Sequence, residues 1–454
     1  MIIETERYSI NIEEKNKGGP GGYESVYLTS EGDAAPKELY ETLEKYQGKS
    51  LLAENQVIRQ RNGEILIDTL NEEKSVGIAS GFKPSGAYHF GHKLTSETVS
   101  FFQKNGAQVF VPVADVECSM DTRLTQEQYE FWAADNLLDW GANGVNLDAA
   151  HVYLQSEEFR VNTLSYIIAR GLNLEQAIDT YGAEKLSSNF PFLFAGITQV
   201  GDILLPQHQD FKNRHSFMVS GQDQDGHMKM SIALTDILLR SSINTLGIET
   251  IPSGFYVPHI RGISGEKASS SKKSTTLYLG PGPEMADLDD RVKKTKEKID
   301  SADRDNLERC SLDMVRFLEC FNQDSLVSFK ELCSEPQYRE LRSFSSTAKT
   351  REEQTKVQFE LDNYLIKRCK EQGQDNIELI NYGIRKALVE HQKKRETILT
   401  YAKFRSKNRS LSADKTEMFP SFWEVPNKAI VDQSKRNKTQ WFDMVVRVGD
   451  QIKP

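Results

Sequence analysis

Two histidines three positions apart, His89 and His92, are the first residues whose types and spacing suggest chemistry. They stand in the string PSGAYHFGH (84–92), between an apolar run and a segment with helical periodicity. On the first turn of a helix, positions i and i+3 share a face. Backbone N–H groups and the helix dipole make such a turn an anion site, and an imidazolium would add charge there. Gly91 would let a flat ligand approach the backbone. The alternative is a surface turn with two incidental histidines.

A second string, GEKASSSKKST (265–275), combines lysines with serines. Lysine ammonium groups neutralise phosphate as point charges, and serine hydroxyls supply hydrogen bonds. A flexible polar loop without a ligand is the alternative. Both strings fall at the ends of one segment of alternating strands and helices, which favours a shared nucleotide site.

The elements that position these strings form an alternating pattern between residues 76 and 282. Strands are expected at VGIAS, AQVFVPVADV, HVYLQ and SFMVSGQ, and helices at HKLTSETVSFFQKNG and TQEQYEFWAADNLLDWGA. This alternation predicts an α/β domain with a parallel, doubly wound sheet of the Rossmann type. Ligands of such sheets bind at the carboxyl ends of the strands.

The rest of the chain divides into three parts. Residues 1–75 are expected to be an N-terminal extension with a helix at 35–47 and a hairpin across Asn62-Gly63. Residues 283–405 contain only helical patterns and predict a separate all-helical domain. Residues 406–454 are expected to be an irregular polar tail with an aromatic cluster, FPSFWEVP, and a possible strand, WFDMVVRV.

Composition bounds the classes of protein that remain. A chain of 454 residues is too long for one ordinary core. No apolar run approaches the roughly 20 residues of a membrane helix, and the N-terminus carries no signal peptide. We therefore expect an intracellular, cytoplasmic protein without a membrane partner. The five cysteines are scattered, which favours buried thiols over a disulfide framework or a zinc site. No protein-held metal is expected.

Charge is distributed unevenly. The net charge is −9, but residues 381–454 hold 16 Lys/Arg against 8 Asp/Glu. A basic C-terminal part on an acidic body could meet a polyanion locally. The densest basic residues, at spacings that can share a helix face, are Arg385, Lys386, Lys393, Lys394 and Arg395. The alternative is that they only solvate the helix.

Taken together, the two strings resemble the double signature of class I aminoacyl-tRNA synthetases, H-x-G-H followed by K-x-S-x-S. GFKPSGAYHFGHKLT, ITQVGDILLPQ (197–207) and GQDQDGHMKM (221–230) are similar to tryptophanyl-tRNA synthetases of the archaeal and eukaryotic kind. The resemblance covers roughly residues 76–400. It implies a Rossmann catalytic domain, a helical anticodon-binding domain, ATP with bound Mg²⁺, tryptophan and tRNA(Trp) as substrates, and a homodimer.

The resemblance also implies roles residue by residue. Stabilisation of the reacting phosphates is expected from His89, His92, Lys267, Ser269, Ser270 and Ser271. Binding of ATP is expected from Pro84, Gly91, Gly221, Asp223 and Lys272. Binding of the amino acid is expected from Gly81, Lys83, Glu117, Gln199 and Gln224. Two readings from the residues alone compete with this: Gln199 as a buried core glutamine, and Asp223 and Asp225 as turn residues. Asp202 is expected to cap a helix N-terminus.

Two departures from the family pattern leave alternatives open. Ala268 stands where methionine is usual in the K-x-S-x-S loop, and Ser270 stands where lysine is usual. After Glu117, Cys118 and Ser119 replace an expected aromatic side chain, although an indole pocket needs aromatic walls. A tyrosyl-tRNA synthetase, or a synthetase paralogue that binds or regulates without charging tRNA, therefore remains possible.

Overall fold

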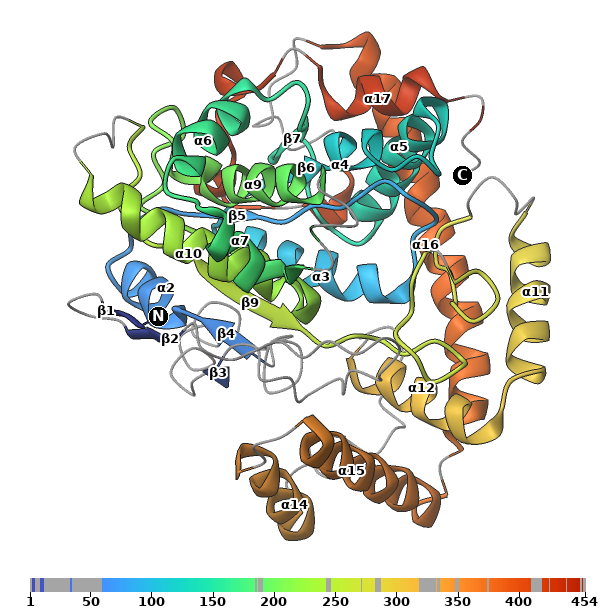
Figure 1. The fold of residues 1–454 in the computed structure, drawn as a ribbon. Coiled ribbons are helices and arrows are strands. Elements are labelled where there is room, and N and C mark those ends of the chain that lie inside the picture. The colour runs from blue at the N-terminus through green and yellow to red at the C-terminus, as the bar shows by residue number, and fades with distance from the viewer. Residues whose placement is uncertain are drawn as a thin grey trace.

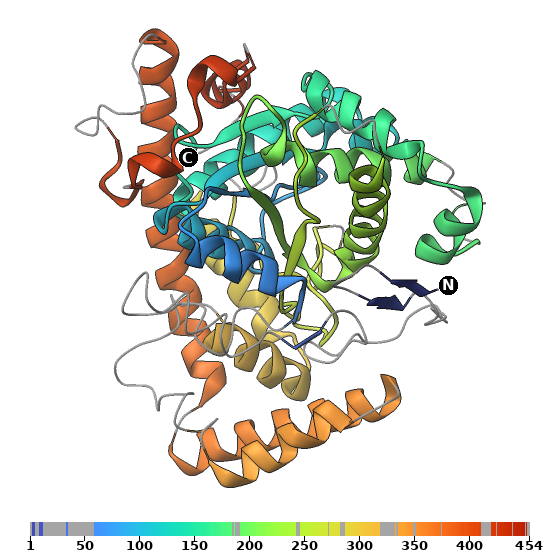
Figure 2. The same ribbon diagram turned by 90° about the vertical axis from the view of Figure 1, so that its left-hand side faces the viewer.

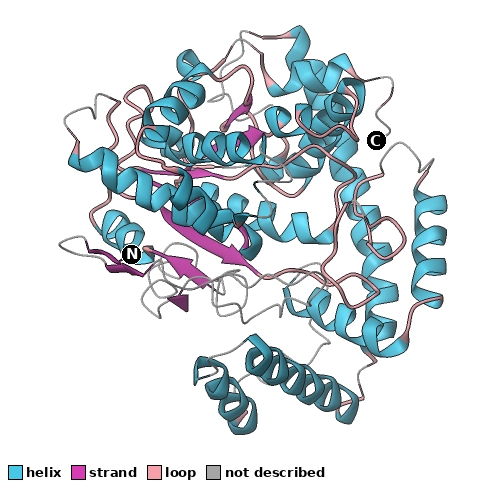
Figure 3. Ribbon diagram, in the orientation of Figure 1, coloured by secondary structure: helices cyan, strands magenta, loops and turns pink. Residues whose placement is uncertain are grey.

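A seven-stranded sheet lies at the centre of the computed structural model (Figures 1 and 3). The spatial order is β3-β4-β9-β8-β5-β6-β7. The bounds are β3 Asp33–Ala34, β4 Arg59–Arg61, β9 Ser253–Val257, β8 His215–Gly221, β5 Val76–Ala79, β6 Gln108–Val113 and β7 His151–Leu154. The strands from β9 to β7 are parallel, which confirms the predicted sheet. The strand order changes direction between β5 and β8, where doubly wound sheets bind ligands.

The structure describes residues 59–451 except 184–185, 187–190, 242–245, 271, 282–286, 318–331, 333–334, 348–350, 374, 410–418, 424, 438 and 450. It also describes β3 and the two short strands β1 (Ile2–Glu4) and β2 (Ser9–Asn11), which pair with each other. The helix expected at 35–47 and the site residue Ser271 lie outside the described residues.

Buried apolar strands and amphipathic helices build the layers around this sheet. Ile78 of β5 pairs with Val109 of β6 and Phe217 of β8, and none of the three is exposed. One face is covered by α2 (Gly63–Asn71), α3 (Phe90–Lys104) and α5 (Gln126–Ala142), and the other by α6 (Phe159–Ala169), α7 (Leu174–Tyr181), α9 (Pro191–Leu204) and α10 (Asp225–Arg240). A short helix, α4 (Asp115–Ser119), follows β6.

Local sequence signals set the ends of two helices beside the site. Thr125 and Gln128 form a capping box at the start of α5, which satisfies two backbone N–H groups. The chain leaves α3 through Gly106, whose φ of 98° is accessible to glycine without strain. Both ends lie where the periodicity of the sequence placed them.

A layer of helices packs beside the sheet unit. It consists of α11 (Leu288–Asp300), α12 (Arg304–Phe317), α14 (Pro336–Thr347), α15 (Arg351–Glu371) and α16 (Asn376–Lys407). The long helix α16 runs along the whole side of the molecule, while α14 and α15 extend away from the sheet (Figure 2). Arg385, Lys386, Lys393 and Lys394 are exposed on α16, but Arg395 is fully buried. The expectation that Arg395 belongs to a basic surface is therefore wrong.

The C-terminal segment is packed rather than irregular. The expected strand WFDMVVRV is the helix α17 (Trp441–Arg447). Its buried residues, Trp441, Phe442, Met444 and Val445, follow helical spacing, which explains the error. The rings of Trp441 and Trp423 lie 5.8 Å apart against Tyr401 of α16. This cluster attaches the end of the chain to α5 and α16.

The segment expected to form a hairpin at Asn62-Gly63 is a strand followed by a helix. Asn62 adopts a left-handed conformation with φ 54°, but the chain then enters α2 instead of a second strand. Gly63, Leu66 and Ile67 of α2 are buried, which is the spacing of one helix face, and this apolar face overrides the turn signal. β4 pairs with β9, and Arg61 donates to Asp225 at the start of α10. Residues 59–75 thus belong to the sheet unit.

Two further expectations concern membranes and cysteines. Among the described helices, none has both the length and the apolar character needed to cross a bilayer. Cys118, Cys310 and Cys369 are buried thiols, as expected. Cys320 and Cys333 lie outside the described residues.

The packing of α17 predicts a large loss of stability on truncation of its central ring. Trp441 is 2% exposed, and its indole N–H donates to Asp148 over 2.7 Å. Trp441→Ala should lower the free energy of unfolding by roughly 3–5 kcal/mol, because it opens a cavity and leaves Asp148 short of a donor. Denaturant unfolding measures this. Val446→Ala on the same helix, where the side chain is 38% exposed, is the control and should change stability by about 0.5 kcal/mol or less. Equal effects would contradict the packed role of α17.

Candidate active site

A cavity of about 1570 Å³ opens at the carboxyl ends of β5 and β8, the switch point of the sheet. The turn after β5, the end of β8 and the loop after β9 form its walls, and α9 forms its inner end. The position agrees with the rule for doubly wound sheets. A side chain at Gly81 could not be accommodated, because a Cβ atom there would lie 1.9 Å from the carbonyl oxygen of Pro112.

The histidine turn forms the start of α3. His89 is the N-cap residue, and its Nδ1 accepts from the backbone N–H of Gly91 over 3.1 Å. The rings of His89 and His92 are stacked, with centroids 3.8 Å apart. Nδ1 of His92 is buried without a hydrogen-bond partner among the described residues. Because a buried unpaired polar atom is costly, this nitrogen is available for a ligand.

Both histidines are neutral near pH 7. Burial, together with His92 and Lys267, holds the pKa of His89 well below its usual range. Burial and then the Lys267 ammonium group lower the pKa of His92 to about 4. The expected imidazolium is therefore absent at this pH. Neutral imidazoles can still donate hydrogen bonds, while positive charge in this part of the site comes from lysine.

The lysine–serine loop touches the histidine turn directly. Ser270 Oγ donates to the carbonyl oxygen of Ala87 over 3.2 Å. Tyr278 Oη donates to the carbonyl oxygen of Ser270 over 3.1 Å, and Tyr278 forms a β-bridge with His89. Ser269 is held by Thr276, whose Oγ1 accepts from its N–H over 3.0 Å. The sequence separates the two strings, and the fold places them side by side.

Lys267 reaches across the cavity to the end of β8. Its Nζ lies 2.8 Å from Asp223 Oδ2, and His259 Nε2 lies 3.6 Å from Asp223 Oδ1. Burial alone would raise the pKa of Asp223, but Lys267 and His259 hold it far below its usual range. Burial and Lys267 lower the pKa of His259 to about 4. The site thus holds an ammonium group, a carboxylate and neutral imidazoles.

The inner end of the cavity is rich in acceptors. Gln199 Nε2 donates to Gln224 Oε1 over 3.0 Å. Asp202, one turn further along α9, accepts from Tyr153 Oη over 2.8 Å and from Gln155 Nε2 over 2.5 Å. Burial raises the pKa of Asp202 to about 7. The expectation that Asp202 caps a helix is wrong, because α9 begins at Pro191 and Asp202 lies in its last turn.

A charged group and several rings form the remaining walls. Lys83 Nζ lies 3.2 Å from Glu117 and 3.3 Å from Asp121. Cys118 is buried against the carbonyl oxygen of Pro84, and burial raises its thiol pKa to about 12. Ser119 is exposed. The aromatic side chains that line the cavity come instead from Phe82, Phe131, Trp132, Trp140 and Tyr278.

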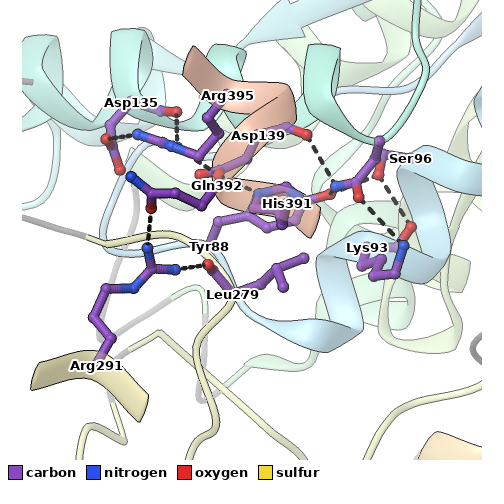
Figure 4. Close-up of polar contacts among 11 residues, drawn as sticks. Tyr88, Lys93, Ser96, Asp135, Asp139, Leu279, Arg291, His391, Gln392 and Arg395 are labelled. Atoms are coloured by element: carbon purple, nitrogen blue, oxygen red, sulfur yellow. Dashed lines mark hydrogen bonds and ion pairs between the residues drawn. The ribbon is translucent and has the colours of Figure 1, made fainter. Parts of the chain in front are cut away.

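A buried network behind the turn joins it to the helical layer (Figure 4). Tyr88, the residue before His89, accepts backbone hydrogen bonds from Leu279 and Gly280. Its hydroxyl contacts Ser96 over 2.6 Å, and its ring stacks on His391 of α16. His391 Nε2 lies 2.7 Å from Asp139, which also pairs with Arg395. The histidine turn is thus supported by contacts with α5 and α16.

The structure brings most of the expected site residues to one cavity. Its lining includes Gly81, Lys83, His89, Gly91, His92, Glu117, Gln199, Gly221, Asp223, Gln224, Lys267, Ser269 and Ser270. Two described residues do not line it. Pro84 supports Cys118 through its carbonyl oxygen, and Lys272 is exposed and pairs with Glu266.

Sequence reasoning missed several polar residues of the lining, among them His259, Asp202 and Ser220. His259 directly follows β9, so the rule that ligands lie at the carboxyl ends of parallel strands could have found it. Asp202 stands three residues after Gln199 on one helix, a spacing that places both on one face. Ser220 at the end of β8 also lines the cavity, and its buried Oγ makes no hydrogen bond to a described residue.

The fold and the site together define an α/β protein of the nucleotide-binding class, with anion-binding groups at the switch point. The family model of class I tRNA synthetases (W and Y) matches residues 71–378, and the chain belongs to this family. Relatives named tryptophan–tRNA ligase include those of Methanopyrus kandleri, 32% identical over 52% of this chain, and Methanocaldococcus jannaschii, 31% identical over 55%. The chain spans 61% and 64% of the length of these two relatives.

Solved structures show the same fold. The tryptophanyl-tRNA synthetase of Aeropyrum pernix superposes with a TM-score of 0.53 at 20% identity, covering 79% of this chain and 93% of that one. The tyrosyl-tRNA synthetase of the same organism gives 0.52 at 18% identity, covering 80% and 99%. The fold therefore does not distinguish tryptophanyl-tRNA synthetases from tyrosyl-tRNA synthetases.

The electrostatics of the cavity predict how its histidines titrate. His92 should titrate near pH 4, and Lys267→Ala should raise its pKa because an adjacent ammonium group is removed. NMR titration of the imidazole signals measures both values. Lys272→Ala is the control, since Lys272 is exposed and pairs with Glu266.

The sign for stability follows from the lowered pKa. The folded chain holds His92 neutral, whereas the unfolded chain protonates it below pH 6.5. The free energy of unfolding that depends on His92 is therefore highest above pH 6.5 and falls as the pH is lowered to about 4. A His92 pKa near 6.5 that Lys267→Ala leaves unchanged would contradict this geometry.

Proposed function

We propose that the chain is an ATP-dependent tryptophan–tRNA ligase, which activates tryptophan as its adenylate and transfers it to tRNA(Trp). The observation that carries the proposal is the contact between the Lys267 loop and the His89–His92 turn across one cavity. Membership of the class I family and relatives named tryptophan–tRNA ligase support the reaction. The anion-binding groups suit a nucleoside triphosphate, and membership of the class I family makes ATP the expected one.

Activation requires little covalent chemistry from the protein. The tryptophan carboxylate attacks the α-phosphorus of ATP, and pyrophosphate leaves in line. His89 and His92 would donate to phosphate oxygens from the start of α3. Lys267 would turn from Asp223 to the phosphates when the ribose hydroxyls donate to that carboxylate. Ser269 and Ser270 would complete the donor set with their hydroxyl groups, Ser270 by turning away from the carbonyl oxygen of Ala87.

Mg²⁺ would be held by the phosphate oxygens of ATP and would screen their charge. Among the described residues, no cluster of three or more histidine, cysteine or acidic side chains could hold a metal ion. The hydrogen-bond donors that line the cavity include lysine ammonium groups, serine hydroxyls and neutral imidazoles, which suit phosphate oxygens.

The inner end of the cavity supports tryptophan over tyrosine. An indole N–H only donates, whereas a phenol hydroxyl both donates and accepts. In its ionised form Asp202 is an acceptor with unused lone pairs, and one N–H of each amide, Gln155 and Gln199, already donates to Asp202 or to Gln224. An indole therefore finds an acceptor there without needing a donor. Lys83 and Glu117 would lie near the carboxylate and ammonium groups of the amino acid.

Two further expectations belong to the same proposal. A homodimer is supported by large exposed apolar side chains on one part of the sheet unit, namely Phe159 and Tyr166 of α6, Leu174 of α7 and Phe194 of α9. Such residues are enriched at subunit interfaces. We propose the cytoplasm as the compartment, in agreement with the buried thiols.

Pyrophosphate exchange tests the reaction and the amino acid together. Tryptophan should support exchange of labelled pyrophosphate into ATP, while tyrosine should not, since acceptors predominate at the inner end of the pocket and an indole N–H only donates. The Lys267→Ala protein is the control for contaminating enzymes. It should bind tryptophan normally but exchange at least about 100-fold more slowly. Exchange with tyrosine alone would identify a tyrosine enzyme, and no exchange with any amino acid would favour a binding paralogue.

Binding of tRNA should depend on the exposed basic residues of α16. Lys393→Glu with Lys394→Glu should weaken tRNA binding. The same double variant should flatten the plot of log affinity against log salt by roughly 0.7–0.9 for each phosphate that the chain no longer neutralises. Filter binding over a series of salt concentrations measures this slope. Tryptophan-dependent exchange should remain intact.

A matched charge change on the sheet unit controls for net charge. Lys74 and Arg170 are both exposed there, and reversing both should leave tRNA affinity nearly unchanged. If the α16 double variant binds tRNA as tightly as the native chain at low salt, these lysines only solvate the helix.

A further inference from the structure

Arg261 is joined to Lys267 by backbone contacts at the base of the Lys267 loop (residues 265–275). The two residues form an antiparallel β-bridge. The N–H of Ala268 donates to Ile260 O over 2.9 Å, and the N–H of Gly262 donates to Glu266 O over 2.7 Å. At the base of the loop, two antiparallel backbone segments are therefore hydrogen-bonded to each other, one containing Arg261 and the other containing Lys267.

The side chain of Arg261 leaves the loop and enters the helical layer. It is 9% exposed, and its guanidinium contacts two carboxylates. Nε and Nη2 donate to Asp313 over 2.7 and 2.5 Å, and the backbone N–H of Arg261 donates to the same carboxylate over 3.1 Å. Nη1 donates to Asp362 over 2.7 Å. Planar bidentate pairing of this kind fixes orientation as well as distance.

Both carboxylates are themselves held in place. Asp313 lies on α12 and Asp362 on α15, and each is 1% exposed. Gln358 Nε2 donates to Asp362 Oδ1 over 2.7 Å, and Arg309 lies 3.6 Å from Asp362. From α12, the thiol of Cys310 donates to the carbonyl oxygen of Arg261 over 3.2 Å. Two helices thus clamp the base of the loop from one side.

We propose that Arg261, held by Asp313 and Asp362, is the positioning residue that sets the place of Lys267 for the activation reaction. The inference rests on the proposed function for its rate effect, but its geometry stands by itself. A buried ion pair adds little net stability compared with apolar packing, so its gain here is a fixed geometry. Lys267 reaches the cavity from a backbone segment that is paired with the segment of Arg261. Arg261 is in turn held by α12 and α15, which lie outside the sheet.

The first test measures the loop without any reaction. Asp362→Asn keeps the shape of the side chain but weakens the hold on Arg261. The amide hydrogens of Gly262 and Ala268 should then exchange with solvent at least about tenfold faster. Glu335→Gln is the matched control. It removes a charge that pairs with Arg368, which lies on the same helix α15 but takes no part in the ion pairs that hold Arg261. Unchanged protection in Asp362→Asn would overturn the proposal.

The second test measures the rate in a double-mutant cycle. Asp362→Asn should lower the maximal rate of tryptophan-dependent pyrophosphate exchange roughly 10–100-fold, with tryptophan affinity unchanged. In a Lys267→Ala background it should have little further effect, because its action passes through Lys267. Equal effects in both backgrounds would show a merely structural role and would contradict the proposal.

The native chain and two variants distinguish a folding defect from a failure of the proposed function. If Asp362→Asn fails to fold by circular dichroism, Arg261→Lys replaces it, since lysine keeps the charge but loses the bidentate geometry. If the native chain shows no exchange with any amino acid, the proposed function fails. The amide protection of Gly262 and Ala268 still decides whether Arg261 positions the loop.

Discussion

The arrangement of the whole molecule depends on a buried arginine that joins its two layers. Arg395 of α16 is not exposed at all, and it donates to Asp135 and Asp139 of α5. Breaking such a pair would leave an uncompensated charge in the interior, at a cost of roughly 3–5 kcal/mol. The pair therefore fixes α16 against the sheet unit. Through His391 and Tyr88 this interaction reaches the histidine turn, so the candidate active site is built on the junction of the sheet unit with the helical layer rather than on the sheet alone.

Burial and the Lys267 ammonium group set the electrostatics of the site. Burial keeps the imidazoles of His89, His92 and His259 neutral, and each has its pKa lowered further by Lys267. Lys267 is in turn paired with Asp223. The Lys267 ammonium group is thus one of the charges that a triphosphate would meet, and its position depends on the base of its loop. That base is tied to α12 and α15 through Arg261.

The sequence predicted the parallel sheet, the helical layer and the residues of the two strings, because each rests on local periodicity or on a short motif. It could not predict contacts that depend on distant segments. Asp202 acquires its partners only when β7 lies beside α9, and His259 meets Asp223 only at the shared strand edge. Asn62-Gly63 has the local chemistry of a hairpin, but the apolar face of α2 against the sheet decides its structure. Arg395 resembles a surface residue in sequence, and only its two carboxylate partners show that it is buried.

The proposed function requires that one cavity, closed by the histidine turn and the Lys267 loop, hold both halves of an aminoacyl adenylate. Calorimetric titration with a non-hydrolysable sulfamoyl analogue of tryptophanyl adenylate is the decisive measurement. The analogue should bind at least about 100-fold more tightly than tryptophan alone, because it resembles the reaction's intermediate and contacts both ends of the cavity. Binding no tighter than that of tryptophan, or equal binding of the tyrosyl analogue, would show that the cavity is not a tryptophanyl-adenylate site.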